Sequence, residues 1–234
     1  MRAAPIILAG LVLAALATSV AGAAVPDDGL RGLPLVEFPV TGDPGPWMAV
    51  HLTGDGGVGV TDKGIGKELS ASGVPVVELN SLKYFMTART PDGAAQDLTR
   101  ILRHYLATWN RQKVVIVGYS MGADVLPFLV DRLPADLRDR VGLVVFLGLA
   151  GAADFHIHLG GFFGVSGKNA LPVRPELEKL RGMKMEGFYG EHDGDSICGS
   201  LPPDLLTCTE MKGGHRVGGN YEGIAQSILA GIGR

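Results

Sequence analysis

The hydrophobic pattern of this chain alternates between a strand-like and a helix-like period. Strand-like runs, most of them apolar and rich in valine, occur at residues 47–53, 74–79, 114–117, 142–150, 184–189 and 207–211. Segments with apolar residues at helical spacing lie between or after them, at residues 63–72, 94–109, 123–130, 176–181 and 221–232. Strands that alternate with helices in this way form a mainly parallel sheet with helices on both faces. We therefore predict an α/β fold in a single domain.

Prolines refine the boundaries of two elements. A first strand is predicted at residues 33–40. Pro34 and Pro39 have no backbone N–H to donate to a neighbouring strand, so this strand should lie at an edge of the sheet. The helix at 94–109 should open at Thr90 and Pro91, because threonine caps a first turn and proline suits the first helical position. The two prolines of the strand thus indicate an edge position, and the Thr-Pro pair indicates where the helix begins.

Residues 151–175 show little periodicity and carry several aromatic and histidine side chains. One interpretation is a segment that covers the active site and binds an acyl or lipid group, because loops at strand ends often do so. The other is a surface excursion that packs on itself. The sequence leaves both interpretations open.

The run at 114–117 ends in Gly118-Tyr-Ser-Met-Gly122 and is followed by the helical pattern at 123–130. This is G-x-S-x-G between a buried strand and a helix, the setting of a nucleophile elbow. The sharp turn holds the serine hydroxyl out above the sheet, and the flanking glycines let neighbouring backbone pass without a Cβ clash. The pattern therefore predicts that Ser120 is a catalytic nucleophile.

A histidine and an acidic cluster follow the serine at the ends of later strands. His215 comes after the strand-like run at 207–211 and just before the last helix, where we expect the general base. Glu191, Asp193 and Asp195 follow the run at 184–189, and we favour Asp193 as the acid, with Asp195 and Glu191 as alternatives. Since parallel strands end at one edge, the order Ser, Asp, His predicts the α/β-hydrolase fold and its triad.

Groups beside the nucleophile should complete the site. The glycine-rich turn after the strand at 47–53 lacks the Gly-Lys-Ser/Thr of a nucleotide-binding loop. We expect it to supply an oxyanion-hole N–H from Asp55 or Gly56, with a second from Met121, although a simple flexible turn is the alternative. Tyr119 is assigned to substrate binding. Asp124, one helical turn past Ser120, is expected to support the elbow or to provide a counter-charge in the substrate pocket.

The amino-terminal segment has the composition of a secretory signal peptide. Arg2 provides a positive start, residues 6–20 are apolar, and Ala21-Gly22-Ala23 is a cleavage signal. The apolar run is shorter than the about 20 residues of a membrane span. We predict cleavage after Ala23, an α/β-hydrolase domain at 24–234, and a periplasmic location.

Composition, charge and the few candidate ligand residues argue against nucleic acid and metal as partners, and the two cysteines suggest a disulfide. The chain is 46% hydrophobic and 19% charged, with a formal net charge of −3 and no Lys/Arg cluster, so nucleic acid is not an expected partner. Cys198 and Cys208, the only cysteines, should form a disulfide in an exported protein; two free thiols are the alternative. His156 and His158 have only Asp154 as a further candidate ligand, too few for a metal site, and no metal or cofactor is expected.

Several segments resemble the VirJ/AcvB family of bacterial periplasmic virulence proteins. They are Leu52-Thr-Gly-Asp-Gly-Gly57, Asn80-Ser-Leu-Lys-Tyr-Phe85, Arg89-Thr-Pro91, Val117-Gly-Tyr-Ser-Met-Gly-Ala-Asp-Val-Leu-Pro-Phe128, Asp195-Ser-Ile-Cys198 and Gly213-Gly-His215. The resemblance implies a periplasmic serine hydrolase. For AcvB-like members it implies cleavage of the aminoacyl ester of lysyl-phosphatidylglycerol, and for VirJ an association with type IV secretion. Arg216 stands where the family is expected to have a second histidine, and Met86 where a tryptophan usually follows Tyr-Phe.

Three functions follow from these observations. The first is hydrolysis of an aminoacylated phospholipid at the membrane surface, which the acidic residues near the predicted site would favour by attracting a cationic aminoacyl group. The second is a non-catalytic adaptor for secretion-system components. The third is a generalist esterase or thioesterase. An intact Ser120, His215 and acidic cluster argue for an enzyme.

Overall fold

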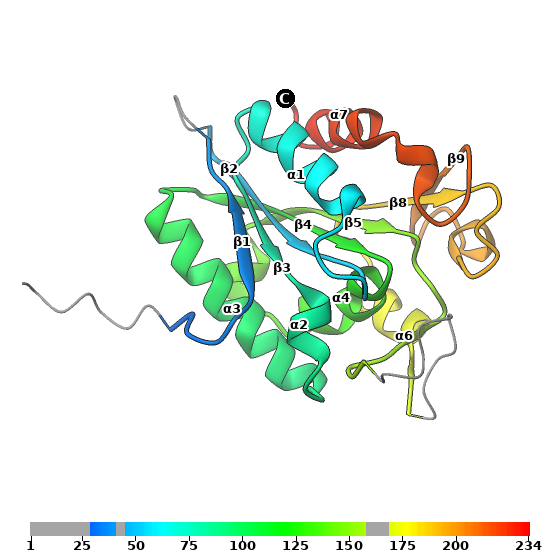
Figure 1. Cartoon of the computed structure of the whole chain (residues 1–234), viewed down its shortest axis with the longest axis horizontal. Coiled ribbons are helices and arrows are strands. Elements are labelled where there is room, and N and C mark those ends of the chain that lie inside the picture. The colour runs from blue at the N-terminus through cyan, green and yellow to red at the C-terminus, as the bar shows by residue number, and fades with distance from the viewer. Residues whose placement is uncertain (1–28, 41–44, 158–168) are drawn as a thin grey trace, which may run out of the picture.

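The fold is built on a seven-stranded sheet in the order β1-β3-β2-β4-β5-β8-β9 (Figure 1). A computed structural model describes residues 29–40, 45–157 and 169–234. The strands of this sheet are β1 (Leu35–Phe38), β2 (Trp47–Leu52), β3 (Val76–Leu79), β4 (Lys113–Tyr119), β5 (Val141–Leu147), β8 (Met185–Gly190) and β9 (Thr207–Met211). Only β1 pairs antiparallel, at one edge, and every other pair is parallel. The predicted α/β-hydrolase fold with a mainly parallel sheet is confirmed.

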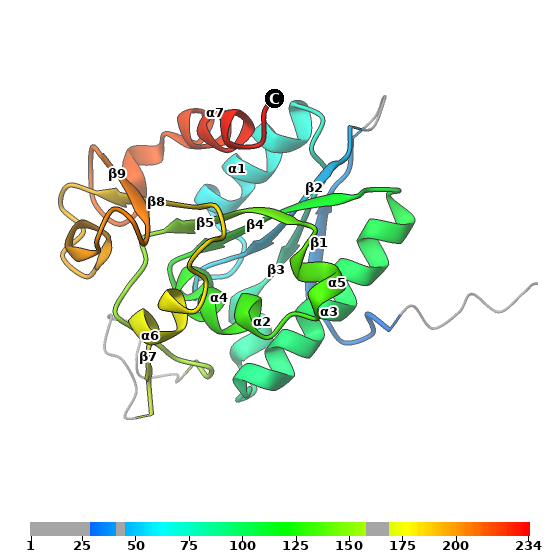
Figure 2. The ribbon, with the colours of Figure 1, turned by 180° about the vertical axis from the view of Figure 1, so that it is seen from behind.

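Helices cover both faces of the sheet (Figures 1 and 2). Helices α1 (Val60–Ala71) and α7 (Tyr221–Gly231) pack together on one face. The other face is covered by α2 (Ser81–Phe85), α3 (Pro91–Thr108), α4 (Met121–Asp131), α5 (Ala135–Arg138) and α6 (Val173–Glu178). The sheet is therefore the middle of three layers.

The strand pattern explains why both faces are filled. Successive side chains of a strand point to opposite faces, so a strand buried on both sides is apolar throughout. In β4, Val114 and Ile116 belong to the core beneath α3 and α4, while Val115 and Val117 belong to the core beneath α1 and α7. All four side chains are 0% exposed.

Helix starts are set by side-chain caps. Thr90 Oγ1 accepts a hydrogen bond from the Gly93 N–H at 3.1 Å, so α3 begins where the Thr-Pro pair predicted. Helix α1 begins at Val60, earlier than the predicted residue 63, because Asp62 Oδ2 accepts the Gly59 N–H at 2.9 Å and secures the first turn. The glycines of this segment had concealed that start.

Short elements were not predicted. Helix α2 has five residues, too few to show a period, and is capped by Asn80 Oδ1, which accepts the Lys83 N–H at 3.1 Å. Strands β6 (Ala152–Ala153) and β7 (Leu171–Pro172) pair antiparallel at the base of the aperiodic segment. Helix α6 ends at Glu178, before the predicted end at residue 181.

The described start of the aperiodic segment packs inward. Phe155 is buried against Phe85 and Phe128, with ring centroids 6.0 Å and 5.5 Å away. Its carbonyl accepts the Arg89 N–H, and Ile157 donates to the Phe85 carbonyl. Residues 158–168, on which part of the predicted cap falls, lie outside the described residues.

The predicted disulfide is present between Cys198 and Cys208, with Cα atoms 5.8 Å apart. It lies directly on Gly187 of β8, where a Cβ would come 2.5 Å from Cys198 Sγ. The predicted signal peptide at 1–23 lies outside the described residues. Among the residues that the structure describes, no helix has both the length and the apolar character needed to cross a bilayer.

Candidate active site

Ser120 occupies a strained turn between β4 and α4. Its backbone has φ 52° and ψ −123°, an unusual conformation for a residue other than glycine, and its N–H donates to the Leu147 carbonyl at 2.8 Å. A Cβ on Gly118 would lie 2.6 Å from the Gly122 carbonyl oxygen, and a Cβ on Gly122 would collide with the Leu52 carbonyl. The turn thus needs both glycines, as a nucleophile elbow does.

The structure brings Ser120, His215 and Asp193 into one hydrogen-bonded array. His215 Nε2 lies 2.8 Å from Ser120 Oγ, and His215 Nδ1 lies 2.9 Å from Asp193 Oδ2. With the proton on Nδ1, the imidazole donates to the carboxylate and accepts the serine hydroxyl. The three residues follow β4, β9 and β8, whose carboxyl ends share one edge of the sheet.

The two partners of Ser120 differ in their exposure. The Asp193 side chain is 3% exposed, whereas that of His215 is 41% exposed. The loops that carry them are joined by backbone hydrogen bonds from Glu191 N–H to the Met211 carbonyl and from His192 N–H to the Gly213 carbonyl. These bonds extend the β8–β9 pairing into the site, so the acid and the base are held as one unit.

The alternative acids have other surroundings. Glu191 Oε1 accepts the Gly213 N–H at 3.2 Å and lies 3.6 Å from His192 Nε2. Asp195 is exposed in the same loop. Geometry therefore places Asp193 at the imidazole and gives Glu191 a supporting contact to the histidine loop.

Gly148 contributes to the site and was not singled out from the sequence. It follows β5 with φ 64°, and a Cβ there would lie 2.8 Å from His215 Cε1 and 3.4 Å from Asp193 Oδ2. Its backbone forms the floor beneath the histidine and aspartate. The available signal was its position directly after a buried strand, at the edge where the other site residues also emerge.

The glycine-rich turn after β2 lies beside the nucleophile. Gly57 N–H donates to the Gly54 carbonyl at 3.0 Å, and a Cβ on Gly54 would lie 3.4 Å from Ser120 Cβ. Asp55 and Gly56 are exposed at the tip of this turn. Met121 begins α4 on the other side of Ser120. The predicted oxyanion-hole residues are therefore close to the nucleophile, and their role stays a prediction.

The segment at residues 80–85, one of those that resemble the VirJ/AcvB family, contacts this turn. Thr53 Oγ1 accepts the Ser81 N–H at 3.0 Å, and a Cβ on Gly57 would lie 2.9 Å from Asn80 Oδ1. Arg89 donates to the Tyr84 carbonyl at 3.3 Å, and its guanidinium lies 4.4 Å above the Tyr84 ring centroid. The contacts of Thr53 and Gly57 join the start of α2 to the loop beside Ser120, and the contacts of Arg89 join the segment after α2 to that helix.

The two residues assigned to substrate binding have further contacts. Asp124 Oδ1 accepts the Ala150 N–H at 2.7 Å. Burial raises the pKa of Asp124 to about 8; the Ala150 hydrogen bond opposes this shift, and the charges of Asp193 and Asp55 add to it. The Tyr119 ring lies 5.6 Å from the His215 ring, and burial raises the pKa of its hydroxyl.

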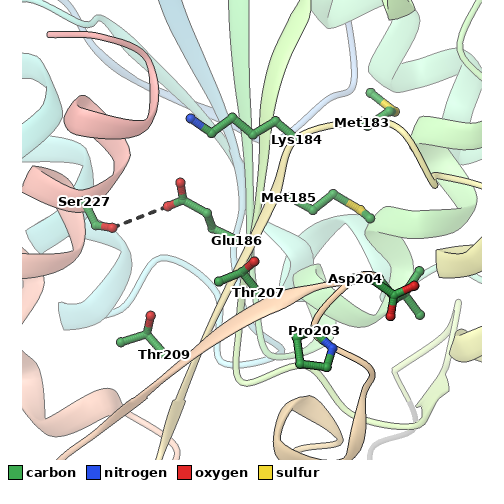
Figure 3. A pocket seen from close by; sticks show the side chains of 10 residues that line it. Met183, Lys184, Met185, Glu186, Pro203, Asp204, Thr207, Thr209 and Ser227 are labelled. Atoms are coloured by element: carbon green, nitrogen blue, oxygen red, sulfur yellow. Dashed lines mark hydrogen bonds between the residues drawn. The ribbon is translucent and has the colours of Figure 1, made fainter.

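A hollow of about 460 Å³ lies elsewhere, at the amino-terminal ends of β8 and β9 (Figure 3). Lys184, Glu186, Asp204 and Ser227 are among its lining residues, and Ser227 donates to Glu186. Ser120, His215 and Asp193 lie beyond the opposite ends of the strands, so the hollow is separate from the site. Within the described ranges, no group of three or more His, Cys, Asp or Glu residues could hold a metal ion.

Residues 46–234 match the sequence profile of the family described as bacterial virulence protein (VirJ). The chain belongs to the VirJ family. The match includes the elbow, the loop after β8 and the histidine loop. The predicted resemblance to this family is confirmed.

Solved structures with a similar fold include α/β serine hydrolases of low sequence identity to this VirJ-family chain. Est1E from Butyrivibrio proteoclasticus superposes with a TM-score of 0.63 at 11% identity, over 87% of this chain and 97% of that one. An α/β serine hydrolase homologue from Coxiella burnetii gives 0.59 at 12%, over 85% and 90%. A serine hydrolase without a lid from Xanthomonas campestris gives 0.53 at 14%, over 85% and 87%. At these identities the likeness establishes the fold.

Proposed function

We propose that this chain is an exported serine hydrolase that cleaves the aminoacyl ester of an aminoacylated phospholipid, with lysyl-phosphatidylglycerol as its substrate. The observation that carries the proposal is the array of Ser120 Oγ, His215 and Asp193, joined at 2.8 Å and 2.9 Å on a strained elbow. Such an array activates a serine hydroxyl for attack on an acyl carbonyl. Membership of the VirJ family supports the choice of substrate through the resemblance to its AcvB-like members.

The reaction follows from the positions of the three side chains. Ser120 Oγ attacks the ester carbonyl carbon while His215 Nε2 takes its proton, and Asp193 stabilises the imidazolium that forms. Backbone N–H groups of the turn at 54–57 and of Met121 receive the negative charge on the carbonyl oxygen. The bond to the glycerol oxygen breaks, and the imidazolium protonates that oxygen. Water, activated by His215, then releases the amino acid from Ser120.

Charge near the nucleophile supports a cationic acyl group. Burial is the largest cause that raises the pKa of Asp124, and the negative charges of Asp193 and Asp55 add to it, so two negative charges act near the nucleophile helix. A protonated amine on the acyl group lowers the energy of such a cluster, whereas a neutral acyl chain does not. This favours an aminoacyl ester over the fatty acyl esters of the same phospholipid.

The disulfide supports a location outside the cytoplasm. Bonds of this kind persist in oxidising compartments such as the bacterial periplasm. Together with the signal-like composition of residues 1–23, it favours export to the compartment where the outer leaflet of the inner membrane is accessible.

Labelling with a fluorophosphonate probe tests the nucleophile. We expect the purified protein to be labelled, and Ser120→Ala to lose all labelling while it keeps the same circular dichroism spectrum. Ser70→Ala, which changes a serine on α1, is the matched control and should be labelled like the wild type. Equal labelling of the Ser120→Ala protein would show that the reactive nucleophile is another residue. No labelling of the wild type would favour a non-catalytic binding scaffold.

Substrate choice needs a separate assay with vesicles. Lysyl-phosphatidylglycerol vesicles should release free lysine at a rate that depends on Ser120, and the fatty acyl chains of the lipid should stay attached. A lysyl head group acetylated on both the α- and ε-amines should react at least ~10-fold more slowly, since the aminoacyl group then carries no positive charge. Equal rates on both head groups would indicate a generalist esterase.

A further inference from the structure

Asp124 joins the nucleophile helix to the turn that follows β5. Its backbone N–H donates to the Ser120 carbonyl at 3.0 Å, in the first turn of α4. Its side chain reaches across to the turn at residues 148–150, where Oδ1 accepts the Ala150 N–H at 2.7 Å. One residue thus contacts both the elbow and the neighbouring strand end.

The same turn supports the other two members of the array. Gly148 lies beneath the His215 ring and the Asp193 carboxylate, as the close approach of its Cα shows. The Leu149 carbonyl accepts the Ile197 N–H at 2.9 Å, and Ala150 forms an isolated antiparallel bridge with Ser196. The acid loop after β8 therefore rests on the turn that Asp124 holds.

These contacts form a continuous series that begins and ends at Ser120. It runs along α4 to Asp124, across to the 148–150 turn, through the acid loop to Asp193, and back through His215. We propose that Asp124 is a positioning residue: its carboxyl group fastens the 148–150 turn to the nucleophile helix and so sets His215 and Asp193 within reach of Ser120. This inference rests on the proposed hydrolase function.

The surroundings of Asp124 explain why the neutral form is the working form. The charged groups that face it are Asp55, from the turn after β2, and Asp193, from the loop after β8, and both are acidic. With its pKa raised to about 8, mainly by burial, the carboxyl group keeps its proton at neutral pH and loses it above pH 8. An ionised Asp124 adds a negative charge near Asp193 and near the oxygen that becomes negative during the reaction. That charge opposes the tetrahedral intermediate.

The test compares two substitutions by the rate of fluorophosphonate labelling between pH 6 and pH 10. The wild-type rate should fall by ~10-fold on the alkaline side, with a midpoint near pH 8. Asp124→Asn keeps the oxygen that accepts the Ala150 N–H and cannot ionise, so it should label at the wild-type neutral rate with no alkaline fall. Asp124→Ala should label ~100-fold more slowly than the wild type at neutral pH and show no alkaline fall, because reacting groups are misplaced and residue 124 cannot ionise. Asp131→Asn, the same change at the far end of α4, should retain the wild-type profile.

Thermal melts at each pH separate loss of the fold from loss of positioning. An Asn variant with the wild-type alkaline fall, or an Ala variant that labels like the wild type, overturns the inference. A wild-type protein that labels at no pH overturns the proposed function instead.

Discussion

The Cα of Gly148 lies so close to His215 that a Cβ on it would fall 2.8 Å from the imidazole Cε1. No side chain fits between this backbone and the ring, so the position of the His215 ring depends on a glycine after β5, two strands away from β9 in the sheet. The substitution Gly148→Ala should displace the imidazole and slow Ser120 labelling by ~100-fold, the scale expected for a misplaced catalytic group. Its positive φ should also cost about 1–3 kcal/mol of folding free energy.

The matched control is Gly182→Ala. Gly182 has φ 92° and nothing within 4 Å of a built Cβ, so it carries the same backbone strain away from the site. This variant should lose a similar free energy of unfolding in urea and label at the wild-type rate. If both variants label alike, the contact between Gly148 and His215 has no catalytic importance.

The acid can be identified by two isosteric changes in one loop. Asp193→Asn should lower kcat by about 10³–10⁴-fold, because an amide neither stabilises the imidazolium nor holds the required tautomer. Asp195→Asn should change kcat by less than about 2-fold, as expected for an exposed side chain away from the array. Steady-state kinetics on a small ester measures both. A larger loss at residue 195 than at residue 193 contradicts the assignment.

The disulfide should contribute to stability. Cys198 and Cys208 are separated by ten positions, and closing a loop of that length stabilises by about 3 kcal/mol on the chain-entropy model. Dithiothreitol should therefore lower the urea midpoint of the wild type. The double variant Cys198→Ala/Cys208→Ala should have the lower midpoint without reductant and should not respond to it. A response of the double variant would show that dithiothreitol does not act through this disulfide.

A buried histidine should make stability depend on pH. His51 on β2 is 0% exposed and lies 3.5 Å from an Asp62 oxygen on α1 and 3.4 Å from a Glu78 oxygen on β3. Burial acts to lower the pKa of His51, but the two carboxyl groups outweigh it, and the pKa is raised. Between the unfolded value of about 6.5 and the raised folded value, the native state binds the extra proton. The stabilisation is fully present below about pH 6.5 and is lost as the pH rises through the folded pKa.

Urea unfolding of the wild type and of His51→Asn, at intervals between pH 6 and pH 9, measures this effect. The difference in unfolding free energy between the two proteins should shrink as the pH rises, and slopes from other titrating groups cancel in the difference. A constant difference across this range would show that the pKa of His51 is the same in the native and unfolded states.

The strands and the fold class followed from the sequence because burial on both faces leaves an unmistakable pattern. Residues 114–117 are apolar without interruption, and the structure buries each of them on one face or the other of β4. Short elements left no such pattern. Helix α2 has five residues and is fixed by a cap from Asn80, and α1 starts among glycines at a position chosen by Asp62.

The site also has residues that the sequence could predict and residues that it could not. The chain order of serine, acid and histidine singled out the residues that the structure brings together, since parallel strands must end at one edge. The choice among Glu191, Asp193 and Asp195 depends on the path of one loop, which local sequence does not specify. Gly148 and Ala150 act through their backbones, and a backbone contact leaves no residue type by which to recognise it.

The side chains of Asp193 and His215 differ in exposure, so the imidazole is buried on the side of the carboxylate and exposed to solvent elsewhere. Nδ1 lies 2.9 Å from the carboxylate of Asp193, whose side chain is 3% exposed. The rest of the ring, in a side chain that is 41% exposed, opens toward the solvent from which the second reactant must arrive. For the proposed hydrolase, the alcohol that leaves and the water that enters would therefore both reach His215 from its solvent-exposed side.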